Sequence, residues 1–381
     1  MSTVPIRYSR RVRPGRLLPL AAGAAVIACV LTAAARSPAQ ARPVSGTAGY
    51  LNGVSTVSAS DAWAVGDPAS APGPLIMHWN GSAWSTVPSH GAPASSGLSA
   101  VSMSSGTNGW AVGWYAGSNG GQTTLTMHWN GTRWTRVPSP NPMAGGNLLT
   151  GVAAVSPTDA WAVGWGYSQT VNGATVILHW NGARWTRVPS PNPIHLPGGD
   201  ALLAVSASSA SDAWAVGYNG LTLHWNGARW AAVPSPGDST LNAVDDVSRT
   251  DVWSAGVDGG NTKTVALRWN GAHWARASSP SPGSGPPDSV PAVNQLTGVS
   301  AVSGSQALSV GSYTTKTGTA PLALRWNGII WQRVPAPGGR ALSILAAVSM
   351  TSATDAWAVG GNQATGKVLI LHWNGTRWTR F

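Results

Sequence analysis

Two residue types that could do acid–base or metal chemistry recur at fixed places in this sequence. All twelve acidic residues are Asp, and eight residues are His. Five of the Asp residues each stand two positions before a Trp at one place in a repeated motif, namely Asp61, Asp159, Asp212, Asp251 and Asp355. Five His residues directly precede the Trp of a Trp-Asn-Gly motif, namely His78, His128, His179, His224 and His372. If either set converged, it could bind a metal or supply paired carboxylates for glycoside hydrolysis.

The spacing of these residues argues against convergence. Successive Trp-Asn-Gly motifs are 44 to 57 residues apart, so each His or Asp belongs to a separate copy of a repeat. Because a metal needs three or four ligands at one point, we predict no metal site and no other cofactor. We interpret the five Asp residues as structural, holding a turn through backbone hydrogen bonds. No strong catalytic motif is present, so we favour a non-enzymatic protein and keep an enzyme as the alternative.

The repeat itself predicts the fold. Seven copies lie between residues 51 and 381, each with a Trp-Asn-Gly marker, at Trp79, Trp129, Trp180, Trp225, Trp269, Trp326 and Trp373. A second marker precedes it, Asp-Ala-Trp-Ala-Val-Gly in its purest form. Repeats of this length that divide into four short strands are typical of propeller blades. We therefore predict an all-β, seven-bladed β-propeller with four antiparallel strands per blade, whose framework Trp residues form the core.

Asn-Gly between the third and fourth strands of each copy indicates a tight hairpin. A two-residue turn at Asn80-Gly81 would make Trp79 and Trp84 diagonal neighbours on one face of the sheet. The first repeat begins with a first strand at Leu51, and the seventh repeat ends with a fourth strand at Phe381. We therefore expect blades one and seven to meet without sharing a strand, although residues 44–50 could instead extend the last blade.

The N-terminus has the features of a targeting segment. A basic stretch ends at Arg16, residues 17–35 carry no charge, and Ala39-Gln40-Ala41 matches a signal-peptidase site. We predict that residues 1–41 are a signal peptide, 42–50 a short linker and 51–381 the propeller. Two alternatives stay open, a lipoprotein signal with lipidation at Cys29 and an uncleaved membrane anchor. The predicted location is secreted or cell-surface, with membrane contact only through this segment.

The formal net charge of +11 overstates how basic the folded part is. Six of the 23 Lys and Arg residues lie in the first 41 residues, which contain no acid, so the remainder carries +5. A mildly basic body without a clustered basic face argues against nucleic-acid binding. Arginines on the fourth strands would protect exposed sheet edges or attract an acidic polymer. We expect a monomer.

Loop lengths indicate where a ligand would bind. The connections from second to third strands and from fourth to first strands vary in length between copies, and the alternation of strand direction places both sets on one face. Function concentrates on variable loops held by a rigid scaffold. The aromatic residues that the framework does not use follow the second strands, and these are the predicted ligand-binding residues: Trp114, Tyr115, Trp165, Tyr167, Tyr218 and Tyr313.

The repeat resembles Trp-rich secreted propellers of high-GC bacteria that are described as kelch-like or galactose-oxidase-like. It is also similar to Asp-box propellers, since Gly131-Thr132-Arg133-Trp134 matches the end of that motif, but Trp129 stands where the Asp belongs. The resemblance implies architecture and not activity. Galactose-oxidase chemistry needs a Cys that the chain lacks after residue 41, and sialidase chemistry needs a Glu that it lacks throughout.

Three functions are compatible with these observations. The first is an exported, non-enzymatic binding module whose aromatic loops take a polysaccharide or an exported protein. The second is an Asp-dependent lyase or hydrolase on the same face, built on residues from one set of loop acids, namely Asp67, Asp200, Asp238, Asp258 and Asp288. The third is an extracytoplasmic assembly or scaffold factor.

Overall fold

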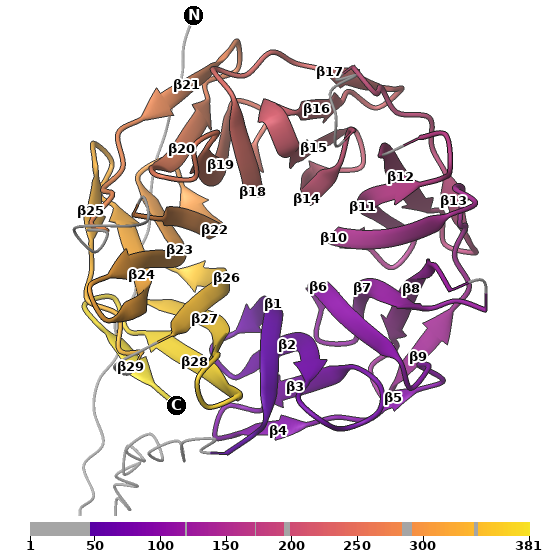
Figure 1. Cartoon of the computed structure of the whole chain (residues 1–381), viewed down its shortest axis with the longest axis horizontal. Helices are drawn as coiled ribbons and strands as arrows, with labels where there is room; N and C mark the ends of the chain where they lie inside the picture. Colours follow the sequence, from indigo (N-terminus) through magenta and orange to yellow (C-terminus); the bar gives the residue numbers. More distant parts are fainter. Residues whose placement is uncertain (1–45, 119, 172, 194–198, 284–291, 339–341) are drawn as a thin grey trace, which may run out of the picture. The chain divides into compact units, whose positions relative to one another are not determined.

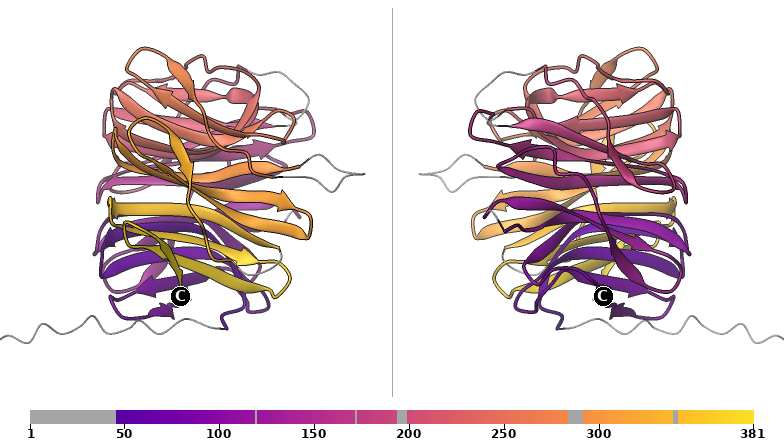
Figure 2. Two further views of the ribbon diagram at one scale, coloured as in Figure 1. Left: turned by 90° about the vertical axis from the view of Figure 1, so that its left-hand side faces the viewer. Right: turned by 90° about the vertical axis from the view of Figure 1, so that its right-hand side faces the viewer.

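A computed structural model describes residues 46–381 except 119, 172, 194–198, 284–291 and 339–341. The predictions for the signal segment, including Cys29, and for Asp288 lie outside these residues. Figure 1 shows seven sheets arranged around a central opening, one for each sequence repeat. Figure 2 shows the strands running between the two ends of this ring, so that the loops gather at the ends. The predicted seven-bladed propeller is confirmed.

Each blade has four antiparallel strands in sequence order, counted outward from the central opening. The innermost strands are β1 (Gly49–Ser58), β6 (Ser96–Ser105), β10 (Gly146–Ser156), β14 (Leu202–Ser209), β18 (Ser239–Ser248), β22 (Asn294–Ser303) and β26 (Ser343–Ser352). The second strands are β2 (Asp61–Pro68), β7 (Asn108–Ala116), β11 (Asp159–Tyr167), β15 (Asp212–Gly217), β19 (Asp251–Asp258), β23 (Gln306–Thr315) and β27 (Asp355–Asn362).

The outer strands complete the blades. The third strands are β3 (Leu75–Trp79), β8 (Gln122–Trp129), β12 (Ala174–Trp180), β16 (Thr222–Trp225), β20 (Thr264–Trp269), β24 (Gly318–Trp326) and β28 (Lys367–Trp373). The fourth strands are β4 (Trp84–Thr86), β9 (Trp134–Val137), β13 (Trp185–Arg187), β17 (Trp230–Ala232), β21 (Trp274–Ala277), β25 (Trp331–Arg333) and β29 (Trp378–Arg380). Blade 2 adds β5 (Ser89–His90), which pairs in parallel with β9, and a short 3-10 turn, η1 (Tyr218–Gly220), follows β15.

The hairpin between third and fourth strands is longer than the sequence analysis predicted. Trp79 pairs directly with Trp84, and four residues connect them, so the two rings are cross-strand partners and not diagonal neighbours. Asn80 causes the difference, because its Oδ1 accepts hydrogen bonds from the backbone N–H groups of Ser82 and Ala83 at 3.0 Å each. This side-chain turn is a use of Asn that competes with the tight two-residue hairpin.

The framework Trp residues pack between neighbouring blades. Trp63 of blade 1 lies 4.5 Å, centroid to centroid, from Trp129 and 5.4 Å from Trp134, both in blade 2. Equivalent tilted and edge-on contacts recur around the ring, for instance between Trp214 and the pair Trp269 and Trp274. Large aromatic rings dominate the energy of such cores, so the blades are held together chiefly by these contacts.

Hydrogen bonds between the innermost strands also join the blades. The first strand usually ends its motif in Ser, whose Oγ accepts a backbone N–H from the next blade. Ser55 accepts from Met103 at 3.0 Å, and Ser349 of blade 7 accepts from Thr56 of blade 1 at 3.0 Å. The ring therefore closes between blades 7 and 1 by the same contact that it uses elsewhere.

Blades 1 and 7 do not share a strand, as the sequence predicted, but the residues at and just before the start of β1 also contribute to closure. Gly49 donates its backbone N–H to Gly366 at 2.8 Å, and Val368 donates to Thr47 at 3.1 Å. The C-terminal Phe381 packs edge-on against Trp79 of blade 1 at 5.6 Å. The blades thus meet without a shared strand, and the segment before Leu51 also pairs with the last blade.

The two ends of the ring differ in their loops. One end carries the β1–β2 type turns and the β3–β4 type hairpins, and we call it the hairpin face. The other end carries the loops from second to third strands and the linkers from fourth strands to the next blade, and we call it the variable face. Hydrogen bonds join these two loop sets, such as Gly73 to Ala94 at 2.7 Å and Gln363 to Leu342 at 2.8 Å. Their predicted placement on one face is confirmed.

Candidate binding face

Four of the six predicted binding residues lie on consecutive blades of the variable face. Trp114, Trp165 and Tyr218 occupy the same repeat position, directly after the Val-Gly of the second strand in blades 2, 3 and 4. Tyr167 lies two residues beyond Trp165, and their ring centroids are 5.9 Å apart. Tyr218 has 42% of its surface exposed, while the other three are half-buried. We call these four residues the aromatic arc.

The other two predicted residues are paired with arginines. Tyr115 comes one position later than Trp114 and packs against the apolar cluster between blades 1 and 2. Nη2 of Arg136 donates a hydrogen bond to its hydroxyl at 2.8 Å, and the guanidinium lies 4.5 Å from its ring centroid. Tyr313 makes the same pair with Arg333 in blade 6. The structure does not bring Tyr313 together with the aromatic arc, because blade 5 separates them.

The loop acids of the variable face differ in their environments. Asp258 accepts hydrogen bonds from the backbone of Thr262 and Lys263, and these bonds together with the Lys263 charge hold the pKa of Asp258 below its usual value despite some burial. Asp200 is buried and Asp238 is exposed. Asp67 accepts a hydrogen bond from Asn52 at 2.9 Å, but burial raises its pKa. The acids lie on different blades, so they do not form one cluster of carboxylates.

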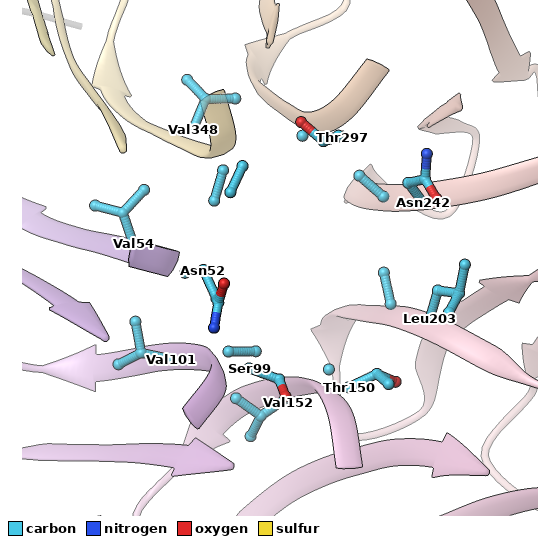
Figure 3. A pocket seen from close by; sticks show the side chains of 18 of the residues that line it. Asn52, Val54, Ser99, Val101, Thr150, Val152, Leu203, Asn242, Thr297 and Val348 are labelled. Atoms are coloured by element: carbon cyan, nitrogen blue, oxygen red, sulfur yellow. The ribbon is translucent and has the colours of Figure 1, made fainter. Parts of the chain in front are cut away.

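The innermost strands of all seven blades line a central pocket of about 160 Å³. The side chains of its wall are mostly small or aliphatic, with Val54, Val101, Val152 and Val348 among them (Figure 3). One polar position, at the irregular point of the innermost strand, interrupts this wall in several blades, at Asn52, Ser99, Thr150, Asn242 and Thr297. No charged side chain is among the described residues that line the pocket.

Most of these polar side chains join adjacent blades. Thr150 donates to the carbonyl of Leu202 at 2.8 Å, and Asn242 donates to the carbonyl of Leu296 at 2.8 Å. Figure 3 shows the amide nitrogen of Asn52 turned along the ring and not toward its centre. The donors of Asn52, Thr150 and Asn242 are therefore used in closing the ring, and the pocket exposes polar as well as apolar atoms to a ligand.

The repeated Asp and His residues form pairs inside blades 1, 3, 4 and 7. Asp61 and His78 are 2.9 Å apart, Asp212 and His224 2.7 Å, and in blade 5 Arg268 takes the place of His beside Asp251. The His ring then lies over the framework Trp, as His78 does over Trp63 at 4.2 Å. Our prediction of a structural role agrees with these contacts, but the predicted partner was wrong. The Asp side chains bond the third strand, because the antiparallel register places His opposite the Trp that follows each Asp.

Two adjacent acids of β18 in blade 5 were not predicted, Asp246, which bonds Ser208 of blade 4, and Asp245, which bonds Ala301 of blade 6. Burial raises the pKa of Asp245 to about 6, and burial followed by the nearby Asp212 charge raises the pKa of Asp246 to about 7. One carboxylate oxygen of Asp246 is buried without a hydrogen-bond partner in the described part of the chain. The adjacent Asp-Asp in an innermost strand was the available signal. Across the described ranges, no three His, Cys, Asp or Glu side chains are grouped so that they could hold a metal.

Comparison with known proteins supports the fold and does not assign a family. No protein-family model matches the sequence, and no curated protein sequence matches it. Among solved structures, "YCF48 bound to D1 peptide" is similar with a TM-score of 0.54 at 14% identity, over 88% of this chain and 95% of that chain. The WD40 β-propeller domain of Doa1 is similar with a TM-score of 0.57 at 9% identity, over 87% and 95%. "Structure of U3-55K" gives a TM-score of 0.58 at 14% identity, over 85% and 93%.

The chain thus has a seven-bladed propeller architecture with WD40-like structural neighbours. At these identities the likeness concerns the fold alone, since unrelated functions share propeller folds. In the described ranges, no helix has the length and apolar character needed to span a membrane.

Proposed function

We propose that this chain is an exported, non-enzymatic binding module that holds a polypeptide segment against the aromatic arc. The observation that carries the proposal is the placement of Trp114, Trp165 and Tyr218 at one repeat position on three consecutive blades. The framework does not need them, since blades 1, 5, 6 and 7 carry Asp67, Val257, Ser312 and Gly361 at that position. Aromatic residues grouped on a rigid surface are the usual anchors of protein interfaces.

A polypeptide fits this surface better than a flat sugar stack does. Only Tyr218 is exposed, and the other three rings of the arc are half-buried. A half-buried ring exposes its edge and not its whole face. A ligand peptide could place a side chain against such an edge while its main chain forms hydrogen bonds with the loops. The similar YCF48 structure carries a D1 peptide, so a propeller of this architecture accommodates such a ligand. Export is supported by the sequence of residues 1–41.

The proposal is tested by selecting peptides that bind the full-length chain from a random peptide library, with insoluble polysaccharides tested in parallel. The arc variant combines Trp114→Ala, Trp165→Ala and Tyr218→Ala. The matched control is Ile329→Ala with Ile330→Ala, which removes apolar surface that is 79% and 48% exposed on the hairpin face. We expect the arc variant to lose at least thirtyfold in affinity for selected peptides, since each aromatic anchor contributes about 1–2 kcal/mol, and the control to bind normally.

Two outcomes would contradict the proposal. Peptide binding that survives in the arc variant but is lost in the Ile329 and Ile330 control would move the site to the hairpin face. Binding to a polysaccharide and to no peptide, lost in the arc variant, would keep the face and replace the ligand. Thermal melts of both variants must resemble that of the parent chain for the comparison to count.

A further inference from the structure

Blade 1 places a carboxylate where blades 2, 3 and 4 place aromatic rings. Asp67 is the blade 1 residue at the repeat position of Trp114, Trp165 and Tyr218. It lies at the end of β2, opposite Tyr50, and the adjacent strand supplies Asn52. Because the framework is built in the other six blades without an acid at this position, the fold does not require Asp67.

Asn52 fixes the carboxylate at the edge of the central pocket. Its Nδ2 donates one hydrogen bond to Oδ2 of Asp67 and another to the carbonyl of Leu98 in blade 2, both at 2.9 Å. Both amide hydrogens are therefore used, and Asn52 cannot turn away from Asp67 without breaking a contact between blades. Asn52 is itself one of the residues that line the pocket (Figure 3).

The second carboxylate oxygen lies beside Trp114 of the next blade. A Cβ at Gly97 would be 2.1 Å from Oδ1 of Asp67 and 3.4 Å from Nε1 of Trp114. The two atoms therefore approach the same point, and only a residue without a side chain leaves room for them. The corresponding residues of blades 3, 5 and 7 are Leu148, Thr240 and Ile344. Glycine therefore stands at this position in blade 2, where the Asp67 carboxylate approaches Trp114, and larger residues stand there in blades 3, 5 and 7.

Asp67 has no internal counter-charge to explain its position. Within the described ranges, no Lys, Arg or His forms an ion pair with it, whereas the hairpin-face acids Asp61, Asp159, Asp212, Asp251 and Asp355 all do. Burial raises its pKa, and the Asn52 hydrogen bond only partly opposes that effect. A half-buried carboxylate without a cation is an unfavourable arrangement that an external cation would relieve.

We infer that Asp67, Asn52 and Trp114 form a pocket for the cationic head of a Lys or Arg side chain belonging to the bound polypeptide. The ammonium or guanidinium group would pair with Oδ1 of Asp67, and its aliphatic stem would pack on the Trp114 indole. This inference rests on the proposed function and adds to it one specificity, a basic residue at the end of the aromatic arc nearest blade 1.

The pocket is tested with Nα-acetyl-lysine methylamide as the probe and its neutral Nε-acetylated form as the matched ligand. The full-length chain is labelled with ¹⁵N, and the indole N–H signal of Trp114 is assigned by its loss in Trp114→Phe. We expect this signal to shift on titration with the cationic probe and not with the neutral one. Asp67→Asn should weaken the cationic probe at least tenfold. Asp238→Asn, which removes the same charge from the same face, should bind it as the parent chain does.

Each result decides the inference. Equal shifts with both ligands, or equal affinity in the parent chain and Asp67→Asn, would overturn it, as would no response of Trp114 at any probe concentration. A thermal melt checks that Asp67→Asn, a nearly isosteric change, keeps the fold. The probe tests only this pocket, and peptide selection tests the proposed function. A failure of one experiment can therefore be told apart from a failure of the other.

Discussion

The hairpin face and the variable face are built from the same seven repeats but use them differently. On the hairpin face, each third-strand Trp donates its indole N–H to a turn carbonyl of its own blade, as Trp79 does to Ala59 at 3.0 Å. Beside it, an Asp or Asn bonds the third-strand His, as Asn108 does to His128 at 2.9 Å. On the variable face, the residue that follows the Gly of the second-strand motif differs between blades and is Asp, Trp, Tyr, Val, Ser or Gly.

The difference teaches where to look for function in a repeat protein. Side chains that recur from blade to blade pack the blade interfaces, and some of them also bond one another, as Asp61 bonds His78, so the fold already uses them. Side chains that depart from the repeat are free to meet a ligand, because the scaffold stays folded without them. The predictions below test this division, beginning with the change of largest effect.

The first prediction compares two Trp residues that differ in role. Trp214 is fully buried between blades 4 and 5, and Trp214→Ala should lower the free energy of unfolding by about 3–5 kcal/mol because it leaves a large cavity. Trp114→Ala, on the half-buried arc, should cost less than half as much. Chemical denaturation of both variants measures the difference. Equal losses would show that Trp114 belongs to the framework.

The second prediction concerns the repeated Asp–His pair. Asp212 is 2% exposed and accepts hydrogen bonds from His224 and from the Ser208 hydroxyl. Asp212→Ala removes both hydrogen bonds and takes the carboxylate partner away from the half-buried His224, so we expect a loss of about 2 kcal/mol. Asp238→Ala on the variable face should change stability by less than about 0.5 kcal/mol, since exposed substitutions usually do. Comparable losses for the two would contradict the contrast between the faces.

The third prediction is a dependence of stability on pH. The pKa of Asp246 is raised to about 7 in the folded chain, well above that of an Asp in the unfolded chain. Between these values the folded chain binds more protons, so stability should rise as the pH falls from about 8 to about 5. It should fall again in stronger acid, where the Asp355 carboxylate, whose pKa its bond to His372 lowers, becomes protonated.

Asp246→Asn isolates this effect. The variant removes the group that takes up the proton, so the gain between pH 8 and pH 5 should shrink, and stability at pH 8 should rise by on the order of 1–2 kcal/mol. Denaturation midpoints at pH 5, 6, 7 and 8 give the comparison. A parent chain that is less stable at pH 5.5 than at pH 8 would show that the raised pKa does not govern this range.

The smallest expected effect separates Tyr115 from the arc. Tyr115→Phe removes the hydrogen bond from Arg136 but keeps the ring under the guanidinium. At this exposed pair we expect a loss of at most about 0.5 kcal/mol. Peptides selected on the parent chain should bind the variant normally. A tenfold loss in affinity would extend the binding surface beyond the aromatic arc.

The repeat pattern was sufficient to predict the propeller, because spacing, Trp markers and turn residues all agreed with one blade plan. It also predicted the face that carries the variable loops, from strand alternation alone. It could not predict the Asp–His partners, since the turn role assigned to Asp61 hid its contact with the third strand. The two-residue turn predicted at Asn80 separately gave the wrong register for the fourth strand. It also treated six aromatic residues as one set, although strand parity separates Tyr115 from Trp114.

The association of Asp67 with Trp114 was beyond sequence analysis for a different reason. The two residues are in different blades, and their approach depends on the glycine at position 97 and on the bridge made by Asn52. Single positions that break a repeat are visible in the sequence, but which breaks meet in space is decided by how adjacent blades pack.

The most direct test of the division between the two faces is hydrogen exchange of the full-length chain with and without a saturating selected peptide. The account predicts slower exchange in the loops after β7, β11 and β15, at residues 115–118, 166–171 and 218–221, and no change in the hairpins at residues 80–83 and 327–330. Protection of the hairpins with unchanged exchange in the three loops would contradict it.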